Sequence, residues 1–245
     1  MTQIFKKFFL LLIPPLFYLK NIRKIKNFLL KILFKNEKNL IIFEKAFFKR
    51  HAFINKAISQ FPECKYLEIG VAQNDVFNSI PLSIKNKFGV DPYSGGNYRM
   101  TSDDFFKKNP NLKFDVIFVD GLHHYLSCQQ DVINSMNSLN KNGIILIDDL
   151  IPKNRLEEQV PRQTEYWTGD IWKVAVELFN SRNIDFKIVK IDSGIGILKL
   201  KNNFEYKKMP ELKSKKFEDF LEYYKSFKLI DSEEALQFIS LNNQK

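Results

Sequence analysis

Glycine is scarce in this chain, with nine glycines in 245 residues. The spacing Gly-x-Gly-x-x-Gly, which lets a helix N-terminus take the pyrophosphate of a dinucleotide, does not occur. The missing glycines argue against a nicotinamide-dependent oxidoreductase, which we keep as an alternative.

Cysteine is rarer still, since Cys64 and Cys128 are the two in the sequence. Two cysteines do not make a disulfide framework, so we expect a reducing, cytoplasmic compartment. For each thiol, the role of a small buried apolar residue is favoured over that of a reactive group.

Long apolar runs are missing as well. The first apolar stretch, residues 8–19, is about a dozen residues long and is split by Pro14 and Pro15. It falls short of the ~20 residues that a membrane-spanning helix requires. No small-residue cleavage site follows it, so we do not expect a secretory signal.

Acidic residues are almost absent from the N-terminal part. Residues 1–50 contain twelve Lys and Arg but only Glu37 and Glu44, whereas the remaining residues hold 26 basic and 26 acidic side chains. The whole net charge of +10 therefore belongs to this segment. We predict that residues 1–43 form a basic, amphipathic helical segment, separate from the domain that follows.

Apolar residues within this segment recur at helical spacing, with lysines around them. The apolar set is Ile25, Phe28, Leu29, Ile32 and Leu33, and the lysines are Lys24, Lys31 and Lys35. Such a helix fits an in-plane anchor on an anionic membrane through residues 1–35, which would place the protein at the inner face. A helix packed on the domain and a partner-binding helix are the alternatives. A nucleic-acid-binding arm is disfavoured because the segment is too apolar to stay solvated.

The clearest positive signal is a pair of apolar stretches that each end in an acidic residue. Residues 66–70 read Tyr-Leu-Glu-Ile-Gly, and residues 88–91 read Phe-Gly-Val-Asp. They predict two buried parallel strands of one βαβ unit, with Gly70 in a tight turn and Asp91 at the tip of the second strand. An acid at that tip suits the two hydroxyls of a ribose. Because an acid entering the turn repels phosphate, the ligand that fits is S-adenosylmethionine.

An ordered series of such stretches resembles the class I S-adenosylmethionine-dependent methyltransferases. It is similar to the bacterial branch with a strand-Asp-Gly-x-His segment, often described as small-molecule or glycan methyltransferases. The matching stretches are residues 66–70, 88–91, 100–106, 114–125, 143–149, 167–172 and 194–198. They span about residues 60–200 and neither end of the chain.

Alternating strand and helix patterns predict an α/β fold. We expect a Rossmann-like, mostly parallel seven-stranded sheet with helices on both faces and an antiparallel strand near its end. The predicted strands are 65–69, 87–90, 114–119, 144–147, 186–191 and 195–200; a further strand before residue 102 is short or lost. The predicted helices are 44–60, 75–84, 102–108, 126–139 and 170–180, with Asn142 and Gly143 as a helix stop. We assign residues 44–200 to the methyltransferase domain and residues 201–245 to a C-terminal helical appendage.

Polar residues after the predicted strands mark the donor site, because ligands bind beyond the carboxyl ends of such strands. Gly70 should line the methionine part and Asp91 should bind the ribose, with Glu68 supporting the turn. The alternative for Asp91 is a helix N-cap before Pro92. The resemblance further implies that Ser102 and Asp103 lie near the adenine, although a simple helix cap fits them equally. Asp120 is included among the donor-site residues.

Three residues after the third parallel strand are candidates for catalysis. Asp120 and His123 are three apart where a loop enters a helix, which can place both on one side of the pocket. His123 or His124 could be the general base, with an ordinary pKa near ~6.5, and only one of two adjacent histidines can face the site. The alternative is a histidine that caps or packs.

Paired acids after the next strand raise the question of a metal. Asp120, Asp148 and Asp149 could form an oxygen-rich Mg²⁺ site that lowers the pKa of a substrate hydroxyl. Sugar O-methyltransferases that resemble this chain use an Asp-x-x-His segment with paired acids in this way. They typically carry Glu-Asp where this chain has Asp148 and Asp149. A metal-dependent site and a metal-free site therefore both remain as alternatives.

A long loop before the last predicted helix carries aromatic residues. Tyr166 and Trp167 are expected near the acceptor, since aromatic faces stack on sugar rings, and Trp172 is expected to pack its helix on the sheet. We therefore expect an O-methyltransferase acting on a small-molecule or glycan hydroxyl, most simply a sugar hydroxyl. A non-catalytic, membrane-associated protein on a methyltransferase-like fold is the remaining alternative. The sequence does not indicate an oligomeric state.

Overall fold

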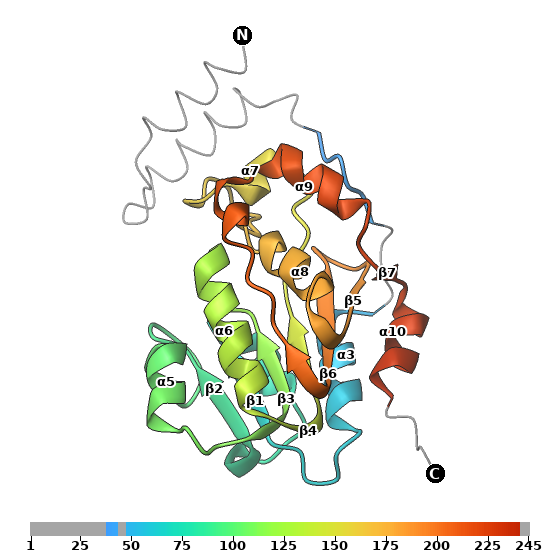
Figure 1. The fold of residues 1–245 in the computed structure, drawn as a ribbon. Helices are drawn as coiled ribbons and strands as arrows, with labels where there is room; N and C mark the ends of the chain where they lie inside the picture. The colour runs from blue at the N-terminus through green and yellow to red at the C-terminus, as the bar shows by residue number, and fades with distance from the viewer. Residues whose placement is uncertain (1–37, 44–47, 241–245) are drawn as a thin grey trace.

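The computed structural model describes residues 38–43 and 48–240. Among these, seven strands form one sheet in the order β2-β1-β3-β4-β6-β5-β7 (Figure 1). Strands β2, β1, β3 and β4 are parallel, and β6 runs antiparallel to both of its neighbours, β4 and β5. The predicted mostly parallel sheet with an antiparallel strand near its end is confirmed.

The four parallel strands form because their sequences are apolar on both faces. They are β1 (Tyr66–Ile69), β2 (Lys87–Val90), β3 (Phe114–Val119) and β4 (Leu139–Ile147). Leu67 pairs with Ile117, which pairs with Ile145, so a row of fully buried residues crosses the sheet. Strands buried on both faces require helices on both sides.

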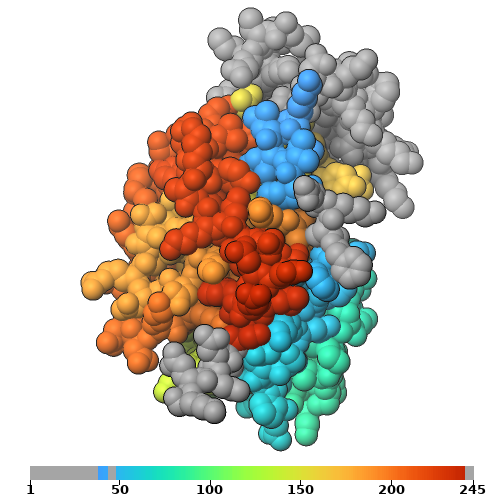
Figure 2. All heavy atoms as spheres, turned by 90° about the vertical axis from the view of Figure 1, so that its right-hand side faces the viewer, coloured from blue at the N-terminus to red at the C-terminus, as the bar shows by residue number. Residues whose placement is uncertain are grey.

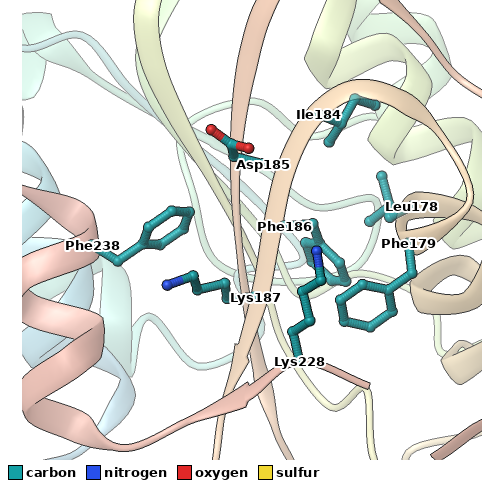
Figure 3. A pocket seen from close by; sticks show the side chains of 8 residues that line it. All are labelled: Leu178, Phe179, Ile184, Asp185, Phe186, Lys187, Lys228 and Phe238. Atoms are coloured by element: carbon teal, nitrogen blue, oxygen red, sulfur yellow. The ribbon is translucent and has the colours of Figure 1, made fainter. Parts of the chain in front are cut away.

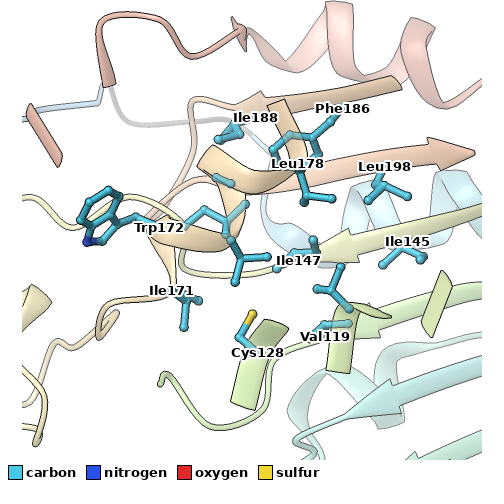
Figure 4. Close-up of a cluster of buried hydrophobic side chains, with 14 of the residues drawn as sticks. Val119, Cys128, Ile145, Ile147, Ile171, Trp172, Leu178, Phe186, Ile188 and Leu198 are labelled. Atoms are coloured by element: carbon cyan, nitrogen blue, oxygen red, sulfur yellow. The ribbon is translucent and has the colours of Figure 1, made fainter. Parts of the chain in front are cut away.

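One face of the sheet is covered by α5 (Ser102–Lys108), α6 (Tyr125–Asn137) and α8 (Trp172–Phe179). The other face is covered by α3 (Arg50–Ile58), the short α4 (Asp75–Ser79) and α10 (Ser232–Ile239). Figure 2 shows α10 lying beside α3 on that side. Both cysteines are free and buried, and Cys128 points into the apolar core in Figure 4.

The antiparallel part of the sheet is a hairpin of β5 (Arg182–Val189) and β6 (Ile195–Glu205). Its turn carries Asp192 at φ 48° and Gly194 at φ 83°, as a tight hairpin turn requires. The predicted hairpin at residues 192–194 is confirmed. Because β6 returns toward β4, residues 193–194 lie against the end of β4, where the backbone N–H groups of Leu150 and Ile151 donate to them.

The C-terminal part contributes more than helices. After a 3₁₀ helix (Pro210–Ser214) come α9 (Phe217–Tyr224), the two-residue strand β7 (Leu229–Ile230) and α10. Strand β7 pairs parallel with β5 and completes the sheet. Phe220 of α9 is fully buried and packs on Trp172, so the ring that was predicted to pack its helix on the sheet packs against α9. The expected helical appendage thus also carries a strand of the sheet.

The strand before α5, predicted to be short or lost, is a single bridge between Val90 and Tyr98. Other boundaries differ from the predictions. Helix α4 ends at Ser79 rather than at residue 84, because Ile80 precedes Pro81 and takes an extended conformation. The prediction that Asn142 and Gly143 stop a helix is wrong. They lie inside β4, where Asn142 has φ 64° near a shift in register.

The short helices α7 (Arg155–Glu158) and 3₁₀ helix Ile84–Asn86 complete the described elements. Helices α7 and α9 lie together at the upper end of the molecule in Figure 1. Residues 38–43 are attached to the loop before α7, since the N–H of Leu40 donates to the Lys153 carbonyl oxygen at 2.8 Å. None of the helices that the structure describes is long and apolar enough to cross a membrane.

Candidate active site

The carboxyl ends of β1, β3 and β4 bring the predicted site residues to one edge of the sheet. The ladder continues past each strand, with the N–H of Asp120 donating to Ile69 O (2.8 Å) and the N–H of Asp148 donating to Val119 O (3.0 Å). These bonds fix where the first residue after each strand lies. Asp120, Asp148 and the Gly70 turn are therefore neighbours, as expected for adjacent parallel strands.

The surroundings of Gly70 leave no room for a side chain. It has φ +85°, and a Cβ added there would lie 2.0 Å from the carbonyl oxygen of Asp120. Its N–H donates to Val90 O at 2.9 Å, which ties the β1 turn to β2. A residue with a side chain would push the β1 turn away from the β3 tip.

Asp91 organises the two loops at the donor end. Its Oδ1 accepts from the N–H groups of Tyr93 and Ser94 (2.7 and 2.8 Å), and its Oδ2 accepts from the N–H of Ala72 at 3.0 Å. Burial raises the pKa of Asp91, but these backbone N–H groups outweigh burial and hold the pKa below its ordinary value. Asp91 caps the residue 92–96 loop and not a helix, and Oδ2 keeps room for a further donor.

The loop after Asp91 packs directly on the β1 turn. Gly95 and Gly96 have φ 67° and 65°, and a Cβ on Gly95 would lie 2.4 Å from Ala72 O. The N–H of Gly96 donates to Asn74 Oδ1 at 2.8 Å, and Asn74 itself has a left-handed conformation. These residues were not predicted as part of the site. The Gly95-Gly96 pair and the Asn-Asp start of α4 were the signals available.

The Glu68 side chain lies in the core, on the same face of the sheet as Tyr66. Its Oε2 accepts from the Tyr66 hydroxyl at 2.7 Å, and the residue is 2% exposed. Burial raises the pKa of Glu68 to about 7. The described hydrogen bond of its side chain therefore goes to Tyr66 in the core beneath the site and not to the Gly70 turn.

Ser102 and Asp103 point toward α6. The Ser102 hydroxyl donates to Asp131 Oδ1 at 2.5 Å, and Asp103 Oδ1 accepts from Asn134 Nδ2 at 3.1 Å. The N-cap of α5 is Thr101, whose side chain accepts from the N–H of Asp104. The two side chains thus join α5 to α6. A nucleoside base at this position could bind only the free backbone N–H groups at the start of α5.

His123 is held on both ring nitrogens. Its Nδ1–H donates to the Trp167 carbonyl oxygen at 2.8 Å, and Nε2 lies 3.4 Å from Asp120 Oδ1 and 3.5 Å from Asp149 Oδ2. The predicted closeness of Asp120 and His123 is what the structure shows. Of the two histidines, His123 faces the acids, while His124 is the N-cap residue of α6 and its side chain makes no cap hydrogen bond.

This environment changes the acidity of the imidazole. Burial lowers the pKa of His123, but the hydrogen bond with Asp120 and the charges of Asp149 and Asp120 outweigh it and raise the pKa to about 9. The expectation of an ordinary value near ~6.5 is therefore wrong, because it ignored two carboxylates. Free of ligands, His123 is an imidazolium at neutral pH, and Nε2 is the nitrogen that exchanges a proton.

Asp148 and Asp149 face different partners although they are consecutive. Asp149 has φ 57°, a conformation that aspartate tolerates, and this turns its carboxylate toward His123. Asp148, with a side chain that is 0% exposed, forms an ion pair with Arg50. Burial raises the pKa of Asp149 to about 6 and that of Asp148 well above its ordinary value, and the positive charge of Arg50 opposes both rises.

Arg50 is the site residue that sequence reasoning missed. It is the first residue of α3, and its Nη1 lies 3.2 Å from Asp120 Oδ2 while also pairing with Asp148. No motif marks it, because it precedes β1 by sixteen positions and belongs to a lysine- and arginine-rich stretch.

The predicted Mg²⁺ set is only partly assembled. Among the described residues, the group with ligand atoms within 4.8 Å of one another is Asp120, His123 and Asp149. It has an imidazole nitrogen where the prediction had Asp148, and Mg²⁺ prefers oxygen ligands. Moreover, Arg50 already pairs with one oxygen of Asp120. The residues present fit an all-oxygen Mg²⁺ site poorly.

The loop before α8 closes over His123. Trp167 stacks on the imidazole with ring centroids 5.2 Å apart and an angle of 27°, and its Nε1–H donates to Gln159 O at 2.6 Å. A Cβ on Gly169 would lie 1.7 Å from His123 O, so the loop and the β3 tip pack as closely as backbone allows. Tyr166 is 79% exposed. Trp167 therefore borders the site, and Tyr166 stands in solvent at its rim.

A small cavity lies elsewhere in the molecule. It measures about 90 Å³ and is lined by residues of β5, the end of α8, Lys228 and Phe238 (Figure 3). Because β5 runs in the same direction as β4, the lining residues 184–187 lie toward the sheet edge opposite the site. This cavity is not part of the strand-tip site.

Comparison with known families identifies the domain. Residues 50–150 match a family model described as a methyltransferase domain, a range that runs from Arg50 past Asp149. The matched range contains the parallel β2-β1-β3-β4 part of the sheet and the strand-tip site. The protein thus carries a methyltransferase domain and is an S-adenosylmethionine-dependent enzyme. No curated protein matches the sequence.

Several solved structures are similar to the chain. An O-methyltransferase from Bacillus cereus in complex with SAH has 10% identity over 76% of this chain and 94% of its own, with a TM-score of 0.48. TomG from Streptomyces achromogenes in complex with SAM has 8% identity over 77% and 93%, with a TM-score of 0.42. MycE in complex with Mg, SAH and mycinamycin VI has 15% identity over 62% and 49%, with a TM-score of 0.39. At TM-scores this low, the likenesses carry no argument about the ligands of this chain.

Proposed function

We propose that this methyltransferase transfers its methyl group to a hydroxyl oxygen of a small-molecule or glycan acceptor, with a sugar hydroxyl as the acceptor group. The observation that supports this is the position of His123. Its Nε2 lies between two carboxylates at the strand tips, under the ring of Trp167. A hydroxyl must lose a proton when it is methylated, and this imidazole is suited to take it.

The transfer is a displacement at the methyl carbon. The acceptor oxygen forms a bond to the methyl carbon while the carbon–sulfur bond of the sulfonium breaks, and the hydroxyl proton goes to Nε2 of His123. Nδ1–H stays bonded to Trp167 O, which fixes the tautomer in which Nε2 is free. Asp120 and Asp149 then stabilise the imidazolium that forms. Since His123 must be neutral beforehand, its raised pKa makes the active fraction grow with pH.

For the donor, we assign the methionine part to the Gly70 turn and the ribose to Asp91. Three backbone N–H groups already hold the Asp91 carboxylate in place, so it does not have to be ordered when the donor binds. Ser102 and Asp103 remain candidates for the adenine end through the start of α5. Glu68 contributes from below, as a buried partner of Tyr66.

For the acceptor, we assign the binding surface to the aromatic residues of the loop 159–167. Trp167 is half-buried and tied at Nε1, whereas Tyr166 is free to stack on a ring. Aromatic faces stack on sugar rings through their apolar C–H faces. Tyr166 and Trp167 would then select the acceptor, while His123 acts on its hydroxyl.

Residues 1–35 would bring the enzyme to an anionic membrane, at the inner face of a cytoplasmic enzyme. These residues lie outside the described part of the structure, so the proposal depends on their sequence: eight Lys and Arg, no acid and many Phe and Leu. A lipid-linked saccharide would fit both this surface and the sugar-hydroxyl assignment. The two competing uses of the segment are packing on the domain and binding a partner protein.

The experiment that tests the function is methyl transfer from labelled S-adenosylmethionine to a panel of acceptors. The panel holds sugar nucleotides, lipid-linked saccharides and phenolic or amine-bearing small molecules of similar size. We expect methylation of a sugar hydroxyl, identified by mass spectrometry and by the methoxy signal in NMR. Methylation of amines alone, or donor turnover without any methylated product, would contradict the assignment. The family match gives no support to a nicotinamide enzyme or to a non-catalytic protein.

A further inference from the structure

Arg50 lies at the centre of the acidic strand tips. Its Nη1 is 3.2 Å from Asp120 Oδ2 and also pairs with Asp148 Oδ2, so one guanidinium nitrogen bridges the ends of β3 and β4. The Arg50 side chain is 31% exposed, that of Asp120 is 20% exposed and that of Asp148 is fully buried. The contact is thus largely withdrawn from solvent, unlike an ordinary surface ion pair.

The helix holds Arg50 firmly in this position. Phe53, Ile54 and Ala57 of α3 follow it at spacings of three, four and seven, and all three are fully buried against the sheet. Residues at these spacings share one helix face, so Arg50 must also project from the sheet-facing side. The position of Arg50 therefore follows from core packing and does not depend on a mobile loop.

The Arg50 guanidinium neutralises the charge of Asp148 and holds one oxygen of Asp120. A fully buried Asp148 requires a positive partner, because an unpaired buried carboxylate is costly. Asp120 has two oxygens, and Arg50 takes Oδ2 while Oδ1 faces His123 Nε2 at 3.4 Å. Arginine keeps its proton at any pH at which the protein folds, so this positive charge is permanent.

We propose that Arg50 is the resident cation of this site, which takes the place of a divalent metal between Asp120 and Asp148 and holds Asp120 in position against His123. A metal between Asp120 and Asp148 would have to share the oxygen atoms that Arg50 already binds. Arg50 acts through Asp120 and is a positioning residue. The effect on turnover rests on the proposed function of His123, whereas the effect on metal binding does not.

The test compares Arg50→Ala, Arg50→Lys and the full-length wild type. His51→Ala is the matched control, since the neighbouring side chain on α3 is exposed. Mn²⁺ binding is followed by electron paramagnetic resonance, SAH binding by calorimetry and methyl transfer with and without EDTA. We expect wild type and His51→Ala to bind no Mn²⁺ at the strand tips and to keep their activity in EDTA.

In Arg50→Ala, Asp120 and Asp148 lose their cation. We expect turnover to fall about tenfold or more with SAH affinity unchanged, and Mn²⁺ binding to appear. Arg50→Lys keeps the charge without the planar fork and should recover part of the turnover and bind no Mn²⁺. Millimolar guanidinium added to Arg50→Ala should restore part of the lost turnover, which a purely structural role would not allow.

Three results would overturn the proposal. They are Mn²⁺ binding by the wild type at the strand tips, loss of wild-type activity in EDTA, and Arg50→Ala that keeps full turnover without gaining Mn²⁺. If Arg50→Ala does not fold, Arg50→Ala/Asp148→Asn removes the buried charge together with its partner. This double variant should bind SAH normally and lose turnover, and full turnover in it also overturns the proposal. If no acceptor is methylated at all, the proposed function fails while the Mn²⁺ results still decide the role of Arg50.

Discussion

At the scale of single residues, Asp91 carries the donor assignment. Its carboxylate is held by the N–H groups of Ala72, Tyr93 and Ser94, with one oxygen able to accept more. We expect Asp91→Ala to weaken SAH binding by about 10- to 100-fold, because a charged hydrogen-bond partner of the ribose is lost. Calorimetry measures this, with the exposed Asp104→Ala as control. Unchanged affinity in Asp91→Ala would refute the ribose role.

His123 predicts a specific pH dependence. Its pKa of about 9 in the fold lies above the ~6.5 of an unfolded chain, so the protonated ring stabilises the fold below pH ~6.5, and this contribution is lost as pH rises through about 9. As a base, His123 has to be neutral. We therefore expect turnover to increase with pH up to about 9, and His123→Ala to be lower by ~10²-fold or more without this increase. A wild-type profile that is flat between pH 7 and 9 would exclude His123 as the base.

Gly70 tests how closely β1 and β3 approach. In Gly70→Ala, the methyl group would meet Asp120 O at 2.0 Å in a backbone conformation that alanine rarely adopts. We expect a loss of about 2 kcal/mol or more in the free energy of unfolding, together with weaker SAH binding. Gly121→Ala is the control, since its new methyl would find neighbours no closer than 3.1 Å. Equal stability of the two variants in denaturant unfolding would contradict the argument.

At the scale of elements, the sequence predicted best the helices and strands whose two ends are both marked by polar residues or turn residues. Elements β2, α5 and β3 begin and end where the predictions placed them, since an apolar run or a helix cap is bounded by polar residues and turn residues. Strand β4 was predicted too short. Its first residues, 139–142, are polar or partly exposed, and a strand paired on one side needs no apolar pattern. Strand β7 has two residues, too few for any period to be read.

The site was predictable where it follows the strands and not where it depends on packing between distant elements. Asp120 and His123 were found because both lie after one strand, at a spacing that brings them together. The pairing of Arg50 with Asp148 joins residues 98 positions apart through the packing of α3 on the sheet, and no local pattern encodes it. For the same reason the raised pKa of His123 was missed, since Asp149 comes from a different strand tip.

At the scale of the whole molecule, the concentration of basic residues in the N-terminal segment leads to a prediction about membrane binding. Residues 1–35 carry eight of the basic residues and no acid. Residues 38–43 are attached to the body of the protein. Ile41 is buried, and Asn39 and Leu40 bond to the segment at the start of α7. Deleting residues 1–35 leaves these contacts in place, so we expect the melting temperature to remain nearly unchanged.

The deletion should abolish binding to anionic vesicles at low salt, because each basic residue near such a surface contributes about 1 kcal/mol. Co-sedimentation with vesicles that contain phosphatidylserine measures this, and vesicles of phosphatidylcholine alone are the control. A full-length variant with Lys24, Lys31 and Lys35 changed to Gln should bind more weakly but not lose binding, since the apolar face remains. A large drop in melting temperature would instead show that the segment packs on the domain. Vesicle binding that survives the deletion would place the membrane contact elsewhere in the protein.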